Sequence, residues 1–416
     1  KYILKLCAKP TRKMPLQFLS SNYPLHDYYF YVPNFCLRVM GFWPQAPNTQ
    51  TKRLWASSNF LMLLIGVLTE MHAGLTALTY NLEKGLDTLC PAGTSAVTLL
   101  KMILISYYRQ DLQYVLKKMQ TMLYGESTNR QILQQHKKII RQFSVLAARF
   151  NFAPFLTGFI TNTAYILKPL IMAWIFWSKG KEIQWTTPFN MTMPSILLRA
   201  PLFPLAYIFT AYTGFLTIFM FAGCDAFYFE FCSHIAALLK MLQADIVSLF
   251  AVFENKLILT EEENKYVENR LKIIISRHNE IIDLTHFFRK RYAVITLAHF
   301  VSAALVIGAS IFDLMTYTGF GRILYVAYTM AALCQLMVYC YGGSMVAENS
   351  VQISTVIFGC NWFICNPQVR RMILLIMIRS QRTLTMSVPF FSPSLATFAS
   401  ILQTSGSIIA LASSFQ

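Results

Sequence analysis

The ionisable side chains inside long apolar stretches are the first candidates for chemistry in this sequence. Glu70 and His72 lie near one end of the apolar stretch 54–77, and His299 lies deep within the stretch 292–312. An ionisable group inside a membrane span is costly to bury and is therefore a candidate functional group. The alternative is a hydrogen-bonded polar group that packs near a helix end. Three isolated groups do not form a proton relay, so the sequence leaves both interpretations open.

Catalytic and metal-binding motifs are absent from the sequence. It contains no G-x-S-x-G, H-E-x-x-H, Walker loop or G-x-G-x-x-G, and we expect no pair of charged groups within the membrane spans. The nine cysteines follow no disulfide or zinc spacing, so we expect them to be small apolar packing groups. The sequence therefore predicts no enzymatic activity, no catalytic residue, no metal and no cofactor.

The elements that carry these side chains are predicted to be membrane helices. Of the 416 residues, 55% are hydrophobic and only 13% are charged, whereas soluble domains usually carry about 25% charged residues. The net charge of +17 fits the positive-inside bias of a multispan membrane protein. The basic residues form no stripe with interleaved aromatics, so we expect no nucleic-acid partner.

Seven stretches are suited to be transmembrane helices, which need about 20 residues each. They are 54–77, 89–107, 150–177, 200–223, 292–312, 323–347 and 394–415. The second is the weakest because Lys101 lies inside it. The uncharged stretch 349–369 is a candidate eighth span, but it is rich in Asn, Gln, Ser and Cys, and we expect a cytoplasmic helix packed in protein there.

The distribution of basic residues predicts the orientation. If the N-terminus is cytoplasmic, most lysines and arginines lie inside, and few lie in outside loops. Those few are Lys84, Lys179, Lys181 and Arg322. The sequon at Asn190 then lies outside, which makes this residue a candidate glycosylation site.

We therefore predict a single all-α membrane domain over 1–416, with seven helices, a cytoplasmic N-terminus and an extracellular C-terminus. Its expected segments are a cytoplasmic N-terminal segment at 1–53, spans one to four at 54–222, a cytoplasmic helical loop at 223–291, spans five and six at 292–347, a cytoplasmic anchor helix at 348–393 and the last helix at 394–416. In the loop, Ile273, Ile274, Ile281 and Leu284 recur on one helical face, so we expect spans four to six to continue as long helices into the cytoplasm.

The layout excludes one seven-helix class and resembles another. The cytoplasmic N-terminus and the lack of Asp-Arg-Tyr and Asn-Pro-x-x-Tyr signatures argue against a G-protein-coupled receptor. The tail 392–415, with Phe398 followed by a run of small and polar residues, is similar to the last span of insect odorant receptors. The short loop between spans four and five resembles that of the odorant-tuning subunits and not the expanded loop of their shared coreceptor.

The resemblance implies a ligand-gated, nonselective cation channel in the plasma membrane of a sensory neuron dendrite. It implies a heterotetramer with the odorant receptor coreceptor, surrounded by membrane lipid, which opens when a volatile odorant binds. Cytoplasmic helices from spans four to seven would anchor the subunits to one another.

The last helix is the predicted pore helix. Ser407, Leu411 and Phe415 recur every four residues and share one helical face, next to the polar Gln403 and Thr404. Rings of such residues form a wet vestibule that an apolar constriction closes, and the resemblance places Leu411 and Phe415 at the gate. Ordinary packing of small residues is the alternative.

The resemblance also implies an apolar odorant pocket in the outer half of the bundle, with aromatic walls and a few hydroxyls. The predicted ligand-binding residues are Thr94, Val97, Thr161, Tyr165, Phe203, Tyr207, Tyr325 and Tyr328. Each is equally suited to core packing or contact with lipid. Two other functions remain open, namely a gustatory-type receptor of the same superfamily and a multispan transporter, against which the expected lack of an intramembrane charged pair counts.

Overall fold

The computed structural model describes residues 24–47, 49–125, 130–183, 185–316 and 320–414. Within these ranges, the side chains that it leaves undescribed are those of residues 82, 83, 130, 309, 311–316, 320–325, 405, 406 and 408–414. Of the predicted site residues, Phe415 lies outside the described part, and so do the side chains of Tyr325 and Leu411. Their predicted roles stay predictions.

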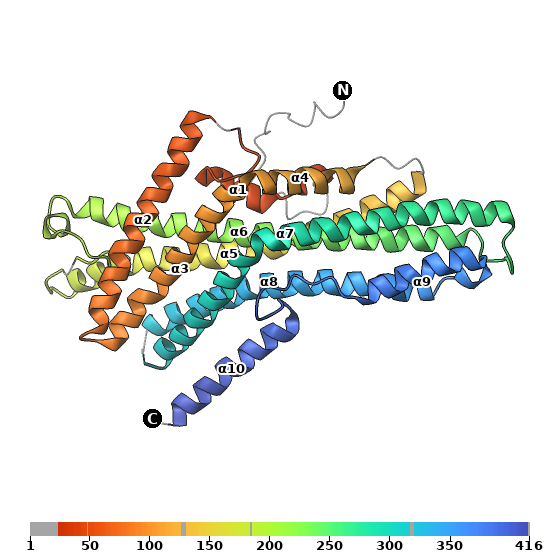
Figure 1. Cartoon of the computed structure of the whole chain (residues 1–416). Helices are drawn as coiled ribbons and strands as arrows, with labels where there is room; N and C mark the ends of the chain where they lie inside the picture. Colours follow the sequence, from red (N-terminus) through yellow and green to blue (C-terminus); the bar gives the residue numbers. More distant parts are fainter. Residues whose placement is uncertain (1–23, 48, 126–129, 184, 317–319, 415–416) are drawn as a thin grey trace.

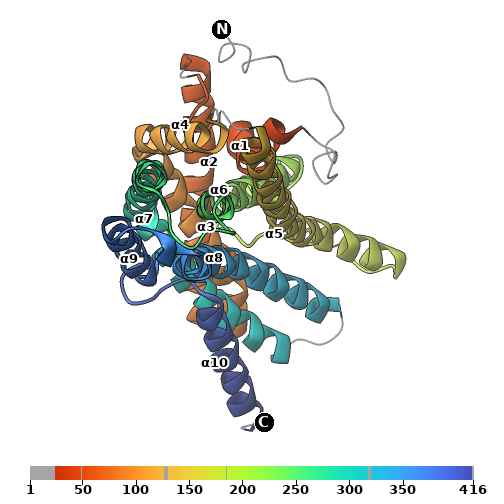
Figure 2. The same cartoon turned by 90° about the vertical axis from the view of Figure 1, so that its right-hand side faces the viewer.

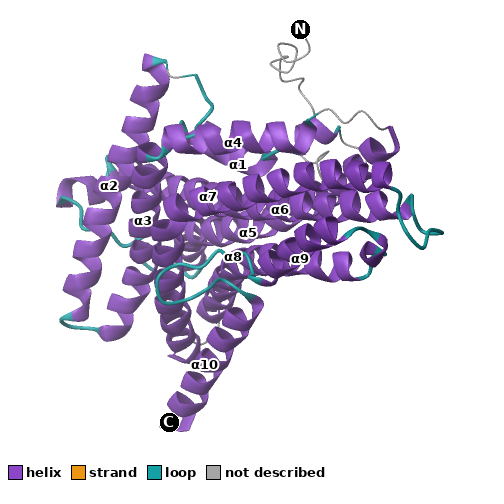
Figure 3. Cartoon of the chain, turned by 45° about the vertical axis from the view of Figure 1, so that its right-hand side comes forward, coloured by secondary structure: helices purple, strands orange, loops and turns teal. Residues whose placement is uncertain are grey.

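The described chain is helical almost throughout, as Figure 3 shows. Its helices are α1 (Tyr31–Met40), α2 (Gln50–Leu78), α3 (Leu82–Tyr107), α4 (Arg109–Tyr124), α5 (Arg130–Ser178), α6 (Phe203–Ala251), α7 (Glu261–Thr316), α8 (Phe320–Phe358), α9 (Pro367–Gln381) and α10 (Leu395–Ser414). Three short 3₁₀ helices accompany them, at Leu25–Tyr28, Ser195–Leu198 and Trp362–Ile364.

Helix α6 is the centre of the bundle. It contacts α1, α2, α3, α4, α5, α7 and α8, and every residue from Met220 to Leu239 is buried. A helix that is apolar on all sides belongs inside a protein or membrane. Figure 1 shows α5, α6, α7 and α8 along the long axis, with α2 and α3 crossing them at one end. The candidate site lies in the part of the bundle where these helices cross.

Six helices in the described part of the chain are long and apolar enough to cross a membrane. They include Gln50–Leu78, Lys84–Tyr107, Gln131–Ser178, Phe203–Ala251, Glu261–Gly308 and Val326–Phe358, and each contains most of one predicted span. The seventh predicted span coincides with α10, where the described apolar part is Leu395–Thr404. The structure thus agrees with a helical membrane-type fold, while the orientation and the seventh crossing stay predictions.

Three helices are longer than a bilayer requires. Helix α6 has 49 residues, α7 has 56 and α8 has 39, whereas about 20 residues cross the hydrocarbon core. Spans four to six therefore continue beyond the membrane thickness, as predicted. The candidate eighth span 349–369 is not one separate helix, because α8 continues to Phe358 and a 3₁₀ turn follows before α9 begins at Pro367.

The predicted inner face of α7 is right at three of its four positions. Ile274, Ile281 and Leu284 are buried, but Ile273 is 46% exposed. Adjacent residues point about 100° apart on a helix with 3.6 residues per turn. Ile273 and Ile274 therefore cannot both lie at the centre of one buried face.

The expectation of no charged pair among the membrane spans is wrong. The Lys101 ammonium on α3 lies 2.5 Å from Asp225 Oδ1 on α6, and both side chains are buried. Tyr339 on α8 donates a hydrogen bond of 2.7 Å to the same oxygen. Asp225 lies two residues beyond the predicted fourth span and was therefore not counted within it. In the structure α6 continues without interruption and places Asp225 beside Lys101.

The cysteines in the described part of the chain are free thiols, and most are buried. Cys365, between α8 and α9, is 2% exposed, and burial raises the pKa of its thiol to about 11. A thiol that stays protonated behaves as a small apolar group. This agrees with the predicted packing role.

Candidate functional site: a pocket between the helices

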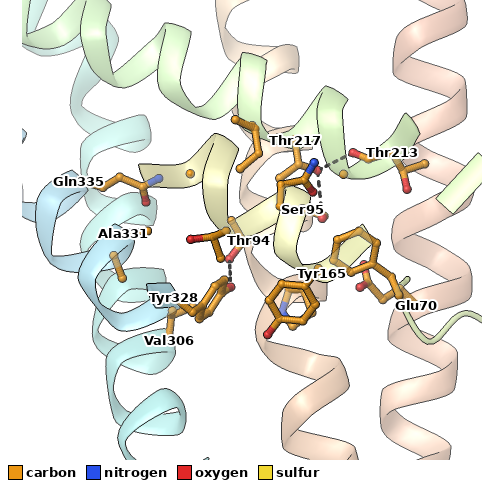
Figure 4. Close-up of a pocket in the computed structure, with 18 of the residues that line it drawn as sticks. Glu70, Thr94, Ser95, Tyr165, Thr213, Thr217, Val306, Tyr328, Ala331 and Gln335 are labelled. Carbon is orange, nitrogen blue, oxygen red and sulfur yellow. Dashed lines mark hydrogen bonds between the residues drawn. The ribbon is translucent and has the colours of Figure 1, made fainter. Parts of the chain in front are cut away.

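A pocket lies where α2 and α3 cross the main bundle. It has about 690 Å³ of empty space, part of it open to the surroundings, and Figure 4 shows the side chains around it. Its wall is formed by α2, α3, α5, α6, α7 and α8, together with the loop before α6. The lining residues are Glu70, Pro91, Thr94, Ser95, Gly158, Thr161, Asn162, Tyr165, Phe189, Met191, Thr213, Gly214, Thr217, Ile218, Val306, Tyr328, Ala331, Ala332 and Gln335.

Four of the predicted ligand-binding residues meet at this pocket. Thr94 on α3, Thr161 and Tyr165 on α5, and Tyr328 on α8 all line it. The hydroxyls of Thr94 and Tyr328 share a hydrogen bond of 2.9 Å, and the rings of Tyr165 and Tyr328 lie 6.2 Å apart, edge to face. Whether they bind ligand stays a prediction, but the structure places them around one space.

The hydroxyl groups of the wall are paired mainly within the protein. Thr161 donates to the carbonyl of Thr157 over 2.9 Å, one turn earlier on α5. Ser95 and Thr217 share a hydrogen bond of 3.1 Å between α3 and α6. A threonine in a helix commonly pairs in this way with a carbonyl of its preceding turn. The pocket therefore combines a mostly apolar surface with hydroxyls that need no water.

The loop between α5 and α6 covers one side of the pocket. Phe189 stacks on Tyr165, with ring centroids 5.6 Å apart and planes at 15°, and Met191 joins the lining. The close approach of Phe189 requires Gly214, because a Cβ there would collide with the Phe189 ring and with Asn162. Neither loop residue was predicted, since hydropathy marks spans and says nothing about which loop folds inward.

Three predicted ligand-binding residues lie outside the pocket lining. Val97 is half-buried on α3 without lining the pocket. Tyr207 donates a hydrogen bond to the carbonyl of Ile166, and Phe203 packs against Trp185 with ring centroids 5.7 Å apart. Tyr207 thus joins α6 to α5, and Phe203 joins α6 to the loop that follows α5. The structure thus gives these two residues packing roles.

The pocket also contains polar residues that the sequence did not assign to it. Gln335 on α8 and Glu70 on α2 lie on opposite sides of the view in Figure 4. Asn162 on α5 lines the same space. Glu70 stood out as an ionisable group in a span, but Gln335 and Asn162 carried no such signal. Only the packing shows that all three face one pocket.

The two histidines in the predicted spans, His72 and His299, make contacts outside the pocket lining. His72 is not among the lining residues and shares a hydrogen bond of 2.9 Å with Thr192. His299 is buried, stacked on Tyr339 with centroids 4.3 Å apart, and its Nδ1 lies 3.9 Å from Asp225 Oδ2. Asn190 is exposed, and its amide donates to Thr88 over 3.2 Å. Its glycosylation stays a prediction.

The predicted pore helix extends away from the bundle. Figures 1 and 2 show α10 leaving the other helices after a start beside α8. Phe398 and Ile401 pack against the core, whereas Gln403, Thr404 and Ser407 are exposed. The polar predicted pore residues thus lie on a surface that the described part of this chain leaves uncovered.

No metal site is formed by the described residues, among which no three His, Cys, Asp or Glu side chains gather closely enough. The pocket offers apolar surface, aromatic rings and a few polar atoms. This is the composition of a site for a small, largely apolar molecule.

Comparison with known proteins identifies the family. The family model described as 7tm Odorant receptor matches residues 81–406. Odorant receptor 10a of Drosophila melanogaster is 51% identical over 407 residues, which cover 96% of this chain and 99% of the relative. The chain belongs to the 7tm odorant receptor family. The resemblance stated from the sequence is therefore confirmed.

Two further odorant receptor comparisons refine this assignment. The odorant receptor coreceptor of Aedes aegypti is 25% identical over 150 residues, which cover only 35% of this chain, so this odorant receptor is not the coreceptor. The solved insect olfactory receptor OR5 from Machilis hrabei, in complex with eugenol, superposes with a TM-score of 0.74 at 15% identity. The superposition covers 94% of this chain and 100% of OR5. That likeness confirms the all-helical membrane-protein fold.

The family assignment also settles the functional class. The chain is an odorant receptor of the membrane, and receptors of this family are not enzymes, which agrees with the prediction of no enzymatic activity. The gustatory-type receptor and the transporter are not favoured. This conclusion rests on the family and not on the expected lack of a charged pair, which the ion pair of Lys101 with Asp225 contradicts.

Proposed function

We propose that this chain is the odorant-tuning subunit of a cation channel that it forms with the odorant receptor coreceptor. A volatile molecule binds in the pocket between the helices and opens a pore that the last helices line. The assembly is a heterotetramer in the plasma membrane of a sensory neuron dendrite. The apolar character of the pocket supports a volatile ligand, because such molecules bind mainly through apolar contact.

A physical connection between the pocket and α10 carries this proposal. Helix α8 lines the pocket with Tyr328 and Gln335. Further along α8, the Ser344 hydroxyl accepts a hydrogen bond of 2.9 Å from the backbone N–H of Leu395, the first residue of α10. One continuous helix therefore lines the pocket and contacts the base of the proposed pore helix.

Helix α7 provides a second connection. Val306 of α7 lines the pocket, and two turns earlier Phe300 packs against Phe391, with ring centroids 4.3 Å apart. Phe391 lies in the segment that leads into α10. A small shift of α7 or α8 is thus transmitted to the base of α10 through direct contacts, because packed side chains transmit displacement.

The exposed polar side chains of α10 support its role in the pore. Gln403, Thr404 and Ser407 do not contact lipid favourably, and in this chain alone they remain uncovered. A water-filled pore between several subunits would provide a polar environment for them. Ligand binding opens the pore only to the extent that the pocket binds ligand more tightly in the open state.

The proposed function is tested by whole-cell recording with a panel of volatiles. We expect odorant-evoked, nonselective cation current when this chain is expressed with an insect odorant coreceptor, beyond the current of the coreceptor alone. Current from this chain alone would replace the heterotetramer with a self-assembled receptor. Saturable flux without channel current would contradict the channel.

The pore assignment makes a separate prediction at Ser407. In the co-assembled channel, Ser407→Cys should react with a charged, water-soluble thiol reagent and lose most of its odorant-evoked current, since exposed Ser407 would face the wet pore. Ile401→Cys, on the same helix but packed against the core, is the matched control and should lose little. Equal modification of both variants, or of neither, would remove Ser407 from the pore.

A further inference from the structure

Two buried polar atoms in the pocket have no hydrogen-bond partner. Glu70 is 2% exposed and Asn162 is 5% exposed, and both line the pocket. The carboxyl oxygen Oε1 of Glu70 and the amide nitrogen Nδ2 of Asn162 are unpaired within the described part of the chain. Buried polar atoms in native proteins are nearly always paired, so each unpaired atom requires an explanation.

The surrounding side chains do not provide partners. The hydroxyls of Thr94 and Tyr328 bind each other, and those of Ser95 and Thr217 do the same. Among the residues that the structure describes, no lysine or arginine lines the pocket, so none of them balances a charge on the Glu70 carboxyl. A buried hydrogen-bond acceptor and a buried donor that both lack partners cost free energy. A ligand with complementary groups recovers that free energy.

We propose that the pocket selects volatile molecules that carry a hydroxyl group, namely alcohols and phenols. The hydroxyl hydrogen is donated to Oε1 of Glu70, and oxygen lone pairs of the ligand accept from Nδ2 of Asn162. The carbon body lies against Tyr165, Phe189 and Tyr328. This inference rests on the proposed function, because it names the ligand class of the same pocket.

Other volatile classes match the two atoms less well. An ether, ester or ketone accepts from Asn162 but has no hydrogen to donate to Glu70, and a hydrocarbon does neither. A protonated amine donates to Glu70 but has no acceptor for Asn162. A carboxylate ligand would have to be buried as a charge in a pocket whose described lining contains no lysine or arginine. A hydroxyl both donates and accepts, so it can pair with either residue.

The experiment compares ligands of matched shape by two measurements. The first is the unfolding temperature of the purified complex with the coreceptor, and the second is the channel current that each ligand evokes. The probes are benzyl alcohol with benzyl methyl ether and toluene, phenol with anisole, and 1-hexanol with hexane. We expect at least one hydroxyl probe to raise the unfolding temperature of the complex more than its partner. The same probe should activate current at about tenfold lower concentration, as expected for one hydrogen bond to a charged or buried group.

Variants of the two residues test the assignment. Glu70→Leu removes the acceptor and should abolish the preference for hydroxyl over ether. Glu70→Gln retains an acceptor oxygen at the same place and should retain most of the preference. Glu70→Met provides a second route to the same loss if Glu70→Leu does not reach the cell surface. Asn162→Leu should weaken the alcohol and the ether probes alike, because both accept from Asn162. Glu182→Gln, an exposed carboxylate in the loop after α5, is the matched control and should change nothing.

The two readouts separate failure of this inference from failure of the proposed function. Current with equal potency for alcohol and ether probes would overturn the hydroxyl preference and leave the channel intact. Hydroxyl-dependent stabilisation without any current would support the ligand class and count against gating by this pocket. If no hydroxyl probe shifts the unfolding temperature, or if Glu70→Leu and Glu70→Met both retain the preference, the inference is wrong.

Discussion

At the scale of single residues, the buried ion pair explains how Lys101 is tolerated inside a membrane helix. Its ammonium lies 2.5 Å from Asp225 and 3.3 Å from the centre of the Phe221 ring. Tyr339 adds a hydrogen bond to the same carboxylate. The pair joins α3, α6 and α8, and each charge depends on the other because neither meets water.

Removing one charge of this pair should therefore destabilise the receptor. We expect Lys101→Met to lower the free energy of unfolding by about 3 kcal/mol, since it leaves the Asp225 carboxylate buried without its cation. The measurement is the unfolding temperature of the purified complex. Lys84→Met, at an exposed lysine before α3's apolar part, should have no effect.

A second variant distinguishes the pair from simple loss of packing. Lys101→Met combined with Asp225→Leu should recover part of the stability, because no uncompensated charge then remains. If the single Lys101→Met variant is as stable as the wild type, the ion pair contributes nothing measurable. If the double variant is less stable than the single one, the loss comes from packing.

At the scale of elements, the junction between α8 and α10 depends on a glycine. Gly343 of α8 lies directly against the carbonyl oxygen of Pro393, and a Cβ at this position would collide with that backbone. The neighbouring Ser344 binds the first residue of α10. A side chain at Gly343 must therefore move the segment that leads into α10.

We expect Gly343→Ala to change gating while ligand binding is retained. The pushed segment alters the position of α10, so the odorant-evoked current should fall several-fold, or the basal current should change, at unchanged surface expression. The odorant-induced rise in unfolding temperature should persist. Gly308→Ala on α7, where a Cβ meets none of the described atoms within 4 Å, is the control, and an equal effect of both would refute the special role of the junction.

At the scale of the whole molecule, the orientation in the membrane is the main untested prediction. The basic residues place the loop with Asn190 outside and the turn between α6 and α7 inside. Asn190 is exposed in this structure, and Ile258 in the α6–α7 turn is 80% exposed. Both positions are therefore accessible to a modifying enzyme on the corresponding side.

Glycosylation provides the test of orientation. The wild-type chain should lose mass on treatment with peptide-N-glycosidase, and Thr192→Ala should abolish that change while Thr192→Ser preserves it. Ile258→Asn creates a second sequon with Thr260 in the turn, and we expect no glycan there. A glycan at residue 258 combined with none at Asn190 would reverse the predicted topology.

The amino-acid sequence by itself determined the helical membrane class, most of each span and the receptor family. The class and the spans depend on local composition, since about 20 apolar residues make a span wherever they pack, whereas the family came from the resemblance of the layout and the tail. It also brought Thr94, Thr161, Tyr165 and Tyr328 together as candidates through a family resemblance, and the structure places them around one pocket.

Only the tertiary structure decided which polar groups meet. Lys101 and Asp225 are 124 residues apart in sequence, and Phe189 reaches Tyr165 from a loop. Phe203 and Tyr207 were candidates for the same pocket through the family resemblance, but they lie outside its lining in this structure. Periodicity shows that a helix has distinct faces, whereas the side of the bundle that each face meets follows from packing between distant segments.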